Sequence, residues 1–347
     1  MLLSLEKFFS LLHNDIYIKT IRRFSFFSLP MIPRYQKIIV IVGPTASGKS
    51  DLAVRLAKEC NGEVVSADSR QVYKGLDIGT GKITKREMAG IPHHLLDCVS
   101  PKRQFTVTEY AEKARAAISE IAARGKLPIV CGGTAFYIDA LLGAVIPAPV
   151  PPNLKLREKL EKETTENLFK KIQKLDPARA EKIDAKNRRR LIRAIEIAVS
   201  RTHAEQTPLP ERSSVRGTAQ TAAGKPKRVL FDTLKIGMMT QKEELRERIQ
   251  KRLAARMKKG MVAEARKLHD EGLSWRRMDA LGLEYRFLTR YLQKKISKTE
   301  MLAQLETAIW RYAKRQMTWW KRDKEIKWMK PNEYMKIKTA VADFLAQ

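Results

Sequence analysis

The segment that most constrains the fold of this chain has the spacing of a phosphate-binding loop, G-x-x-x-x-G-K-[ST]. It follows a β-branched run at residues 37–42 and precedes a run typical of a helix start at residues 50–57. A strand, a glycine-rich turn and a helix N-terminus together direct backbone N–H groups toward one anion. The segment consists of Gly43, Pro44, Thr45, Ala46, Ser47, Gly48, Lys49 and Ser50.

The glycines and the last two residues of this loop have distinct predicted tasks. Gly43 and Gly48 allow the backbone to wrap closely around an anion. Lys49 adds a positive charge for the phosphates, and the Ser50 hydroxyl is placed to ligate Mg²⁺. A chance glycine turn is the alternative, and the flanking strand and helix weigh against it. The chain is therefore predicted to bind a di- or triphosphate, as ATP-binding loops of this type do, while the reaction stays open.

The charge of the chain points to a polyanionic partner. Lys and Arg number 68 against 38 Asp and Glu among 347 residues, which gives a formal net charge of +30. Nucleic acid is the first candidate for such a partner, and a solvated basic surface is the alternative. The length allows two domains, or one domain with an insertion.

Cysteines, histidines and apolar runs give no sign of a disulfide framework, a metal cluster or a membrane span. Cys60, Cys98 and Cys131 lie far apart and are odd in number, which is typical of thiols in a reducing compartment such as the cytoplasm. The pair His93-His94 lacks neighbouring ligands at a metal spacing and is predicted to be a loop feature. No apolar run is long enough to cross a bilayer.

The alternation of strand-like and helix-like segments predicts an α/β fold. Strand patterns at 63–67 and 127–131 flank an alanine-rich helical pattern at 106–124. Such alternation indicates a parallel sheet with helices on both faces, whose ligands bind at the carboxyl ends of the strands. That rule places Lys49, Asp68 and Thr134 around one cleft.

Prolines at 147–152 mark a boundary, after which the chain is helical in pattern and strongly basic. A Ser/Thr/Gly/Pro-rich loop at 202–227 precedes a strand pattern at 229–236, and amphipathic helices are predicted at 244–261 and 299–322. We therefore expect a P-loop α/β core at 36–147 and 226–330 and a helical insertion at 148–225. Residues 1–35 are expected to be a dispensable extension, with Met31 as an alternative start.

Asp68 is the leading candidate for chemistry in the cleft. It ends the strand pattern at 63–67, where a Mg²⁺-binding aspartate or a general base is expected. Gln71, three residues later, is able to offer a paired donor and acceptor to an adenine edge. The alternative is structural, with Asp68 capping a turn or helix start.

Taken together, the motifs resemble the tRNA dimethylallyltransferase (isopentenyltransferase) family, in its bacterial type. The resemblance runs from about residue 38 to residue 325. The segments DSRQVY at 68–73 and KRQMTW at 314–319 are far more specific than the phosphate loop. The other segments that carry the resemblance are 76–80, 93–97, 132–134 with Tyr137, and 190–196.

The resemblance implies a fold, a reaction and a set of partners. It implies a P-loop core whose helical insertion closes over the anticodon stem-loop of tRNA. It also implies transfer of a dimethylallyl group from dimethylallyl diphosphate to N6 of the adenosine just 3′ of the anticodon. The loop would then hold a diphosphate leaving group together with Mg²⁺, and the enzyme would be a monomer.

The resemblance assigns roles to residues in and around the cleft. Asp68 matches the general base, Thr134 matches a residue that contacts the bridging oxygen or the target nucleotide, and Lys49 serves the diphosphate. Arg252 matches an arginine that engages the diphosphate, although a solvated helix face is its alternative. The tRNA-binding positions are Asp68, Ser69, Arg70, Gln71, Thr134, Arg157, Arg189, Arg190, Leu191, Ile192 and Arg193. Tyr73, Trp319 and Trp320 are candidates for stacking on bases, with core packing expected for at least one tryptophan.

Four positions depart from the usual family sequence. Gly81 and Ile83 stand where Ala and Pro are usual, and Ala135 begins a pair that replaces Gly-Leu. Leu283 lies in Leu-Gly-Leu-Glu-Tyr, where Gly-Tyr-Lys/Arg-Glu is usual. None of these removes a proposed catalytic side chain.

Two other functions compete with prenyl transfer. A kinase that uses ATP in the same loop leaves the charge and the arginine-rich insertion unexplained. An RNA-binding protein without catalysis does not need Lys49 and Asp68 together. Replacing Asp68 by alanine separates them, because only the transferase loses turnover while it keeps tRNA binding.

Overall fold

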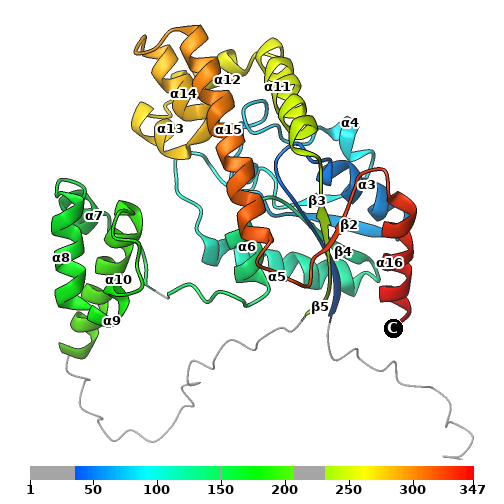
Figure 1. Cartoon of the computed structure of the whole chain (residues 1–347), viewed down its shortest axis with the longest axis horizontal. Helices are drawn as coiled ribbons and strands as arrows, with labels where there is room; N and C mark the ends of the chain where they lie inside the picture. The colour runs from blue at the N-terminus through cyan, green and yellow to red at the C-terminus, as the bar shows by residue number, and fades with distance from the viewer. Residues whose placement is uncertain (1–35, 149, 207–230) are drawn as a thin grey trace, which may run out of the picture.

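The computed structural model describes residues 36–148, 150–206 and 231–347. The predicted extension at 1–35, including Met31, lies outside these residues. The described core contains a six-stranded, entirely parallel sheet with the order β3-β2-β4-β1-β5-β6 (Figure 1). The predicted α/β class with a parallel sheet is thus confirmed. The strands are β1 Gln36–Val42, β2 Gly62–Ser66, β3 His93–His94, β4 Leu127–Cys131, β5 Phe231–Met238 and β6 Lys327–Met329.

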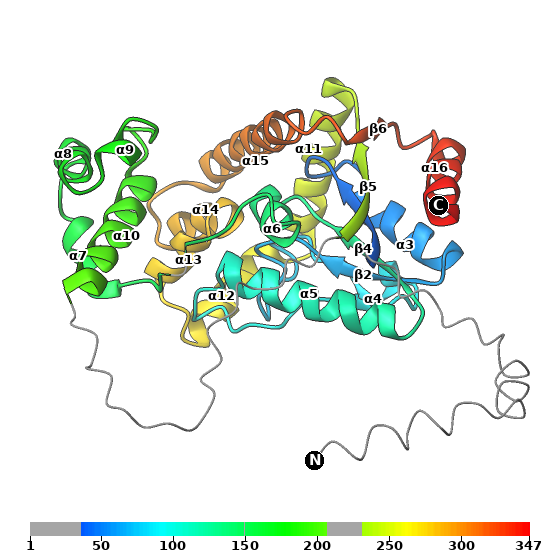
Figure 2. The same cartoon turned by 90° about the horizontal axis from the view of Figure 1, so that it is seen from below.

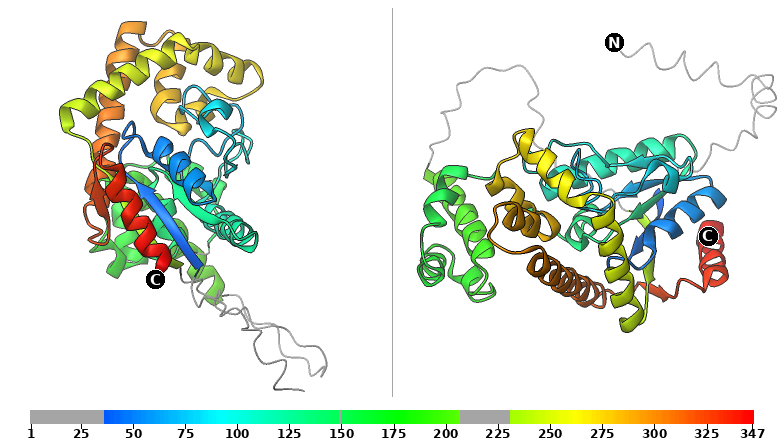
Figure 3. Two further views of the ribbon diagram at one scale, coloured as in Figure 1. Left: turned by 90° about the vertical axis from the view of Figure 1, so that its right-hand side faces the viewer. Right: turned by 90° about the horizontal axis from the view of Figure 1, so that it is seen from above.

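The central strand β1 is buried on both faces, as its unbroken apolar run predicts. Ile39 and Ile41 face helices α3 (Lys49–Glu59) and α16 (Tyr334–Ala346), which lie side by side in Figures 1 and 3. Ile38, Val40 and Val42 face the other way, toward α5 (Val107–Ala123) and α6 (Ala135–Leu141). Each fully buried aliphatic side chain contributes roughly 1.5–3 kcal/mol of transfer free energy.

A second group of helices lies over the carboxyl end of the sheet and is continuous with its core (Figure 1). The helical pattern expected at 244–261 is interrupted at Gly260, whose φ of 95° ends one helix and begins the next. The strand β6 and the helix α16 were not predicted. The group comprises α11 Lys242–Lys258, α12 Met261–Asp270, α13 Trp275–Leu281, α14 Leu283–Leu292 and α15 Lys298–Trp320, and a short α4 spans Lys85–Met88.

The histidine pair forms the short edge strand β3, so its prediction as a loop feature is wrong. It pairs with β2, and His94 Nε2 lies 2.7 Å from the Glu63 carboxylate. Burial raises the pKa of Glu63, but hydrogen bonds from Lys126, His94 and Arg124 outweigh it and lower the pKa to about 2. His94 therefore belongs to a polar cluster around Glu63 at the sheet edge, while His93 Nδ1 lies 2.8 Å from the Ile91 carbonyl oxygen.

The helical insertion has a hydrophobic core of its own and stands to one side of the sheet (Figures 1 and 2). Its helices are α7 Leu154–Leu160, α8 Thr165–Leu175, α9 Pro177–Ala180 and α10 Arg188–Gln206. Leu168, Ile172 and Leu191 are fully enclosed between α8 and α10. Pro149 and most of the predicted loop at 202–227 lie outside the described residues, as does the start of the strand expected at 229–236.

The buried carboxylate of Glu196 joins the start of the insertion to α10 through ion pairs and hydrogen bonds. The side chain of Glu196 is 1% exposed and pairs with Arg157 and Arg193. It also accepts a hydrogen bond from the Asn153 backbone, and Arg193 donates to the Val150 carbonyl at 2.7 Å. Burial raises the pKa of Glu196, but the hydrogen bonds from both arginines outweigh it and hold the pKa below its usual value.

We expect Glu196→Gln to lower the local free energy of unfolding of the insertion by about 3 kcal/mol. This is the low end for a broken buried ion pair, because both guanidinium groups keep some contact with water. The depressed pKa means that this stabilisation is present above the usual carboxyl pKa and is lost as the pH falls through the lowered one. Hydrogen exchange of α8 and α10 amides measures the change, with the exposed Glu158→Gln as a control expected to shift stability by under about 0.5 kcal/mol. Equal protection in the two variants would exclude this role for Glu196.

None of the helices in the described part of the chain is long and apolar enough to cross a membrane.

Candidate active site at the carboxyl ends of the strands

Three loops that leave the ends of neighbouring strands meet at one point. The phosphate loop follows β1, residues 67–71 follow β2 and residues 132–134 follow β4. The Ser69 amide donates to the Thr134 hydroxyl at 3.0 Å, and the Thr134 amide donates to the Ala67 carbonyl at 3.1 Å. The charges of Asp68 and Arg252 both act on the pKa of Lys49, so both side chains lie near its ammonium group. The structure therefore brings Lys49, Asp68, Thr134 and Arg252 together.

The phosphate loop adopts the backbone that its glycines predict. Gly43 and Gly48 have φ angles of 144° and 89°, in the region that favours glycine. A Cβ at Gly43 would lie 2.9 Å from the Met238 carbonyl oxygen of β5. Ala46 takes a φ of 64° without being glycine, which marks local strain in the loop. Ser50 is exposed in the first turn of α3.

Lys49 is held over the loop before any ligand binds. Its Nζ donates to the Pro44 carbonyl at 2.5 Å. Burial, assisted by the charge of Arg252, lowers the pKa of Lys49 to about 8. Cys131, at the end of β4, lies close behind, and burial raises the pKa of its thiol to about 12. The neutral thiol makes Cys131 part of the packing of the site.

Asp68 caps a turn, which is the structural role that the sequence left open. Its Oδ1 accepts from the Arg70 amide at 2.8 Å and from the Gln71 amide at 3.2 Å, so the carboxylate caps a turn. No described residue donates to Oδ2, which leaves this oxygen able to accept a proton. The cap fixes the orientation of the carboxylate.

Arg252 belongs to the site, and its alternative as a solvated helix face is wrong. Its Nη2 donates to the Gly81 carbonyl at 2.8 Å, while the neighbouring Lys251 leaves 80% of its side chain exposed. Burial and the charge of Arg256 lower the pKa of Arg252, yet it stays a cation at neutral pH. The guanidinium group is thus a fixed positive charge beside Asp68 and Lys49.

One of the four sequence departures, Gly81, lies against Arg252. Gly81 has a φ of 59°, and a Cβ there would lie 2.3 Å from Nη2 of Arg252, so glycine admits the guanidinium group. Leu283 begins α14 with a φ of 37°, and Ala135 begins α6. Ile83 is half-buried beside the loop.

Gln316 and Tyr312 of α15 also belong to this site, and no role was predicted for either. Gln316 is 6% exposed, accepts from the Thr45 amide at 2.9 Å and donates to the Gly133 carbonyl at 2.8 Å. It therefore ties the phosphate loop to the loop of Thr134. Tyr312 forms a hydrogen bond with Thr134, and burial raises its pKa above the usual value. The KRQMTW segment at 314–319 was the sequence signal that could have identified Gln316.

We expect Gln316→Ala to weaken the binding of inorganic diphosphate about 10-fold. Two neutral hydrogen bonds of roughly 0.5–1.5 kcal/mol each hold the two loops in register, and alanine removes both. Titration calorimetry measures the change, with Gln250→Ala as the control because Gln250 is exposed and its side chain donates to the Glu306 carboxylate, away from the phosphate loop. Unchanged affinity in Gln316→Ala would mean that the loops keep their register without this link.

The predicted RNA-binding residues separate into exposed and buried groups. Arg189 and Arg190 are exposed in the first turn of α10. The side chains of Leu191 and Ile192 are 0% and 8% exposed inside the insertion, which corrects their prediction as contact residues. Their apolar faces place the arginines on the surface.

The candidates for stacking on bases separate in the same way, and the core packing expected for at least one tryptophan is confirmed by Trp320. Tyr73 and Trp320 are each 2% exposed, so their rings are part of the core. Trp319 is half-buried and its Nε1 donates to Asp139 at 2.9 Å. Trp319 is therefore the one ring of the three with exposed surface near the cleft. Arg157 and Arg193 are half-buried in the ion pairs with Glu196.

Within the described residues, no three His, Cys, Asp or Glu side chains gather as a metal-binding group. Ser50 is the sequence-predicted ligand, and its hydroxyl is a hard oxygen beside the phosphate position. Mg²⁺ commonly takes one or two protein oxygens and fills its other positions with phosphate oxygens and water. This donor set fits Mg²⁺ bound together with a diphosphate.

Comparison with known proteins agrees with this geometry. The IPP transferase family model matches residues 71–323. The tRNA dimethylallyltransferase 1 of Syntrophus aciditrophicus is 40% identical over 310 residues, covering 87% of this chain and 96% of the relative. The tRNA dimethylallyltransferase 2 of Treponema denticola is 43% identical over 286 residues, covering 82% and 91%.

Solved structures show the same fold. The tRNA isopentenylpyrophosphate transferase of Bacillus halodurans matches with a TM-score of 0.64 at 33% identity, over 90% of this chain and 97% of that chain. A eukaryotic dimethylallyltransferase acting on tRNA matches with a TM-score of 0.71 at 25% identity, over 90% and 80%. The resemblance inferred from the motifs is confirmed.

Proposed function

The chain belongs to the IPP transferase family, and we propose that it transfers a dimethylallyl group from dimethylallyl diphosphate to tRNA. The acceptor is N6 of the adenosine 3′-adjacent to the anticodon, and the products are N6-(dimethylallyl)adenosine and diphosphate. The observation that carries this proposal is the meeting of a phosphate loop, Asp68 and Thr134 in one cleft. The activity is that of a prenyltransferase. Relatives named as tRNA dimethylallyltransferases weigh against the kinase alternative.

The phosphate loop binds the diphosphate and stabilises it as it leaves. The bond between C1 of the dimethylallyl group and the bridging oxygen breaks, and negative charge grows on that oxygen. Loop amides at the N-terminus of α3, Lys49 and Arg252 supply positive charge at that position before the reaction begins. Such preorganised charges stabilise a transition state without reorganising at the moment of reaction.

Asp68 removes the proton that the new bond displaces. N6 of adenosine is a poor nucleophile, because its lone pair is delocalised into the ring. As N6 bonds to C1, Oδ2 of Asp68 accepts the N6 proton, which balances the charge on the amine. The hydroxyl of Thr134, already held by the Ser69 amide and near Tyr312, is placed to contact the bridging oxygen or the nucleotide.

Mg²⁺ is proposed as the metal, held by Ser50 and the diphosphate oxygens. It supplies charge neutralisation for the departing diphosphate.

The basic surface of the helical insertion binds the RNA in this proposal. Arg189 and Arg190 on the insertion are free to contact phosphates, which fixes the register of the stem-loop without reading sequence. The target base leaves its stack at a cost of a few kcal/mol, less in a loop than in a duplex. We further propose that the enzyme acts as a monomer in the cytoplasm.

Nucleoside mass spectrometry tests the function. Unmodified tRNA is incubated with the protein, Mg²⁺ and dimethylallyl diphosphate, and one C5H8 unit is expected on the adenosine next to the anticodon. A tRNA with guanosine at that position is the matched control and gains nothing. No gain on the first tRNA, together with ATP turnover on a small acceptor, would support the kinase instead.

A further inference from the structure

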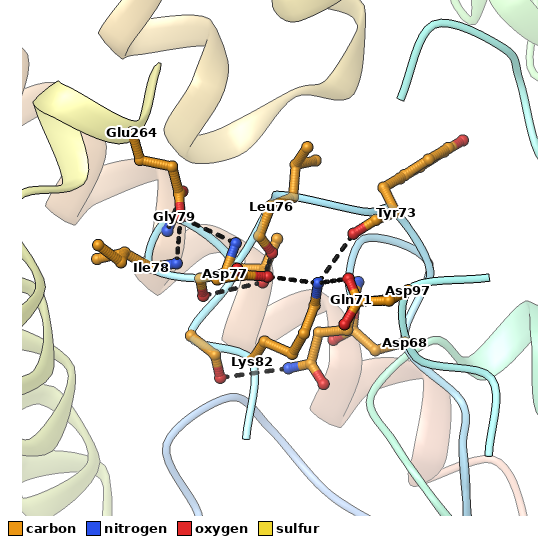
Figure 4. A network of polar contacts seen from close by, with 12 residues as sticks. Asp68, Gln71, Tyr73, Leu76, Asp77, Ile78, Gly79, Lys82, Asp97 and Glu264 are labelled. Atoms are coloured by element: carbon orange, nitrogen blue, oxygen red, sulfur yellow. Dashed lines mark hydrogen bonds and ion pairs between the residues drawn. The ribbon is translucent and has the colours of Figure 1, made fainter. Parts of the chain in front are cut away.

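The loop of residues 77–82 lies against the site, and a single carboxylate from α12 collects its backbone amides. Glu264 Oε2 accepts from the Asp77 amide at 3.0 Å and from the Ile78 amide at 2.6 Å. Its Oε1 accepts from the Gly79 amide at 2.8 Å. Figure 4 shows the carboxylate directed at these consecutive amides. A carboxylate with several charge-assisted hydrogen bonds is a strong local restraint.

Tyr285 adds a fourth donor to the same carboxylate. Its hydroxyl donates to Glu264 Oε1 at 2.7 Å, and its ring is 1% exposed. Burial and the nearby Glu264 charge raise the pKa of Tyr285 well above its usual value, so the hydroxyl keeps its proton. Gly79 leaves room for the ring, because a Cβ there would lie 2.7 Å from both Cζ and the hydroxyl oxygen.

The carbonyls of this loop hold the arginines of α11. Arg252 donates to the Gly81 carbonyl at 2.8 Å, and Gln71 reaches the same oxygen at 3.3 Å. Arg256 donates to the Gly79 carbonyl at 2.7 Å and pairs with Glu284 at 2.8 Å. The loop thus transmits the position of α12 to a guanidinium group in the cleft.

The far end of the loop is fixed from the other side. Lys82, whose side chain is 5% exposed, pairs with Asp77 at 2.6 Å and also with Asp97. It donates to the Tyr73 carbonyl at 2.9 Å (Figure 4). Lys82 therefore restrains this end of the loop, while Glu264 restrains the amides of residues 77–79.

We propose that Glu264, supported by Tyr285, is a positioning residue that orients Arg252 toward the diphosphate through the loop of residues 77–82. The inference rests on the proposed function only in taking Arg252 as a diphosphate ligand.

The first test is Glu264→Gln, which keeps the size of the side chain. It replaces one carboxylate oxygen, which accepts hydrogen bonds, by an NH2 group that faces N–H or O–H donors. We expect the KM for dimethylallyl diphosphate to rise about 30-fold while the KM for tRNA stays within about twofold, since the lost bonds involve a charged group. Tyr285→Phe removes one donor alone, and about a threefold rise is expected. The matched control is Glu271→Gln, because Glu271 is exposed near the end of the same helix and pairs with Lys267.

A double-mutant cycle with Arg252→Ala separates positioning from general stability. If Glu264 acts through Arg252, Glu264→Gln changes the KM less than about twofold in the Arg252→Ala background. A full effect in both backgrounds would overturn the proposal, as would a KM unchanged in both Glu264→Gln and Tyr285→Phe. Should Glu264→Gln fold poorly, the cycle is run with Tyr285→Phe, whose single lost atom leaves the core filled.

The same cycle on the binding of inorganic diphosphate, followed by calorimetry, separates this inference from the proposed function. A wild-type protein that transfers nothing to tRNA refutes the function. Non-additive losses of diphosphate affinity would still support the positioning role, and additive losses would refute it.

Discussion

Replacing Asp68 by asparagine is expected to lower kcat for transfer by about 100- to 10,000-fold, the range for loss of a general base. Asparagine keeps an Oδ1 that accepts from the Arg70 and Gln71 amides, so the turn after β2 persists. It has no basic oxygen for the N6 proton. The loss is therefore expected in kcat, with the affinity for tRNA unchanged.

Single-turnover transfer at saturating substrates measures this effect, and fluorescence anisotropy of labelled tRNA measures binding. Asp270→Asn is the control, because Asp270 is exposed at the end of α12, away from the phosphate loop. A kcat within about tenfold of wild type would remove Asp68 as the base. A parallel loss of tRNA affinity would instead assign it to RNA binding.

The core and the meeting of Lys49, Asp68 and Thr134 were predictable from sequence for a physical reason. The phosphate loop specifies its own strand, turn and helix over a short stretch of chain. Parallel strands then bring their carboxyl ends to one edge, so polar residues that end β2 and β4 must lie near the loop. The local sequence pattern and the geometry of a parallel sheet therefore sufficed to predict these features.

The supporting residues were not predictable because their partners are remote in sequence. Gln316 reaches Thr45 across 271 positions, and Glu264 reaches Ile78 across 186. Nothing in the local sequence distinguishes these side chains from ordinary polar residues of an amphipathic helix. In the segment 189–193 the apolar side chains of Leu191 and Ile192 already indicated a buried face, and their burial in the core of the insertion confirms it.

Replacing Lys49 by methionine is expected to lower kcat/KM for dimethylallyl diphosphate by about 100- to 1,000-fold, the cost typical of losing one preorganised charge-stabilising group. Lys49→Arg retains a positive charge and is the matched variant, although its planar group fits the loop less closely. Both variants are compared in transfer assays and in calorimetry with inorganic diphosphate.

The pH dependence of diphosphate binding shows whether Lys49 supplies the positive charge that binds the anion. Because the pKa of Lys49 is lowered to about 8, the free protein loses this charge as the pH rises through that value, and affinity is expected to fall. Arginine stays protonated throughout, so Lys49→Arg is expected to lack this decline from about pH 7 to about pH 10. Ionisation of diphosphate itself affects both proteins equally and cancels in the ratio of their affinities. A ratio independent of pH would exclude Lys49 as the titrating group and leave Arg252 and the loop amides as the source of the anion site.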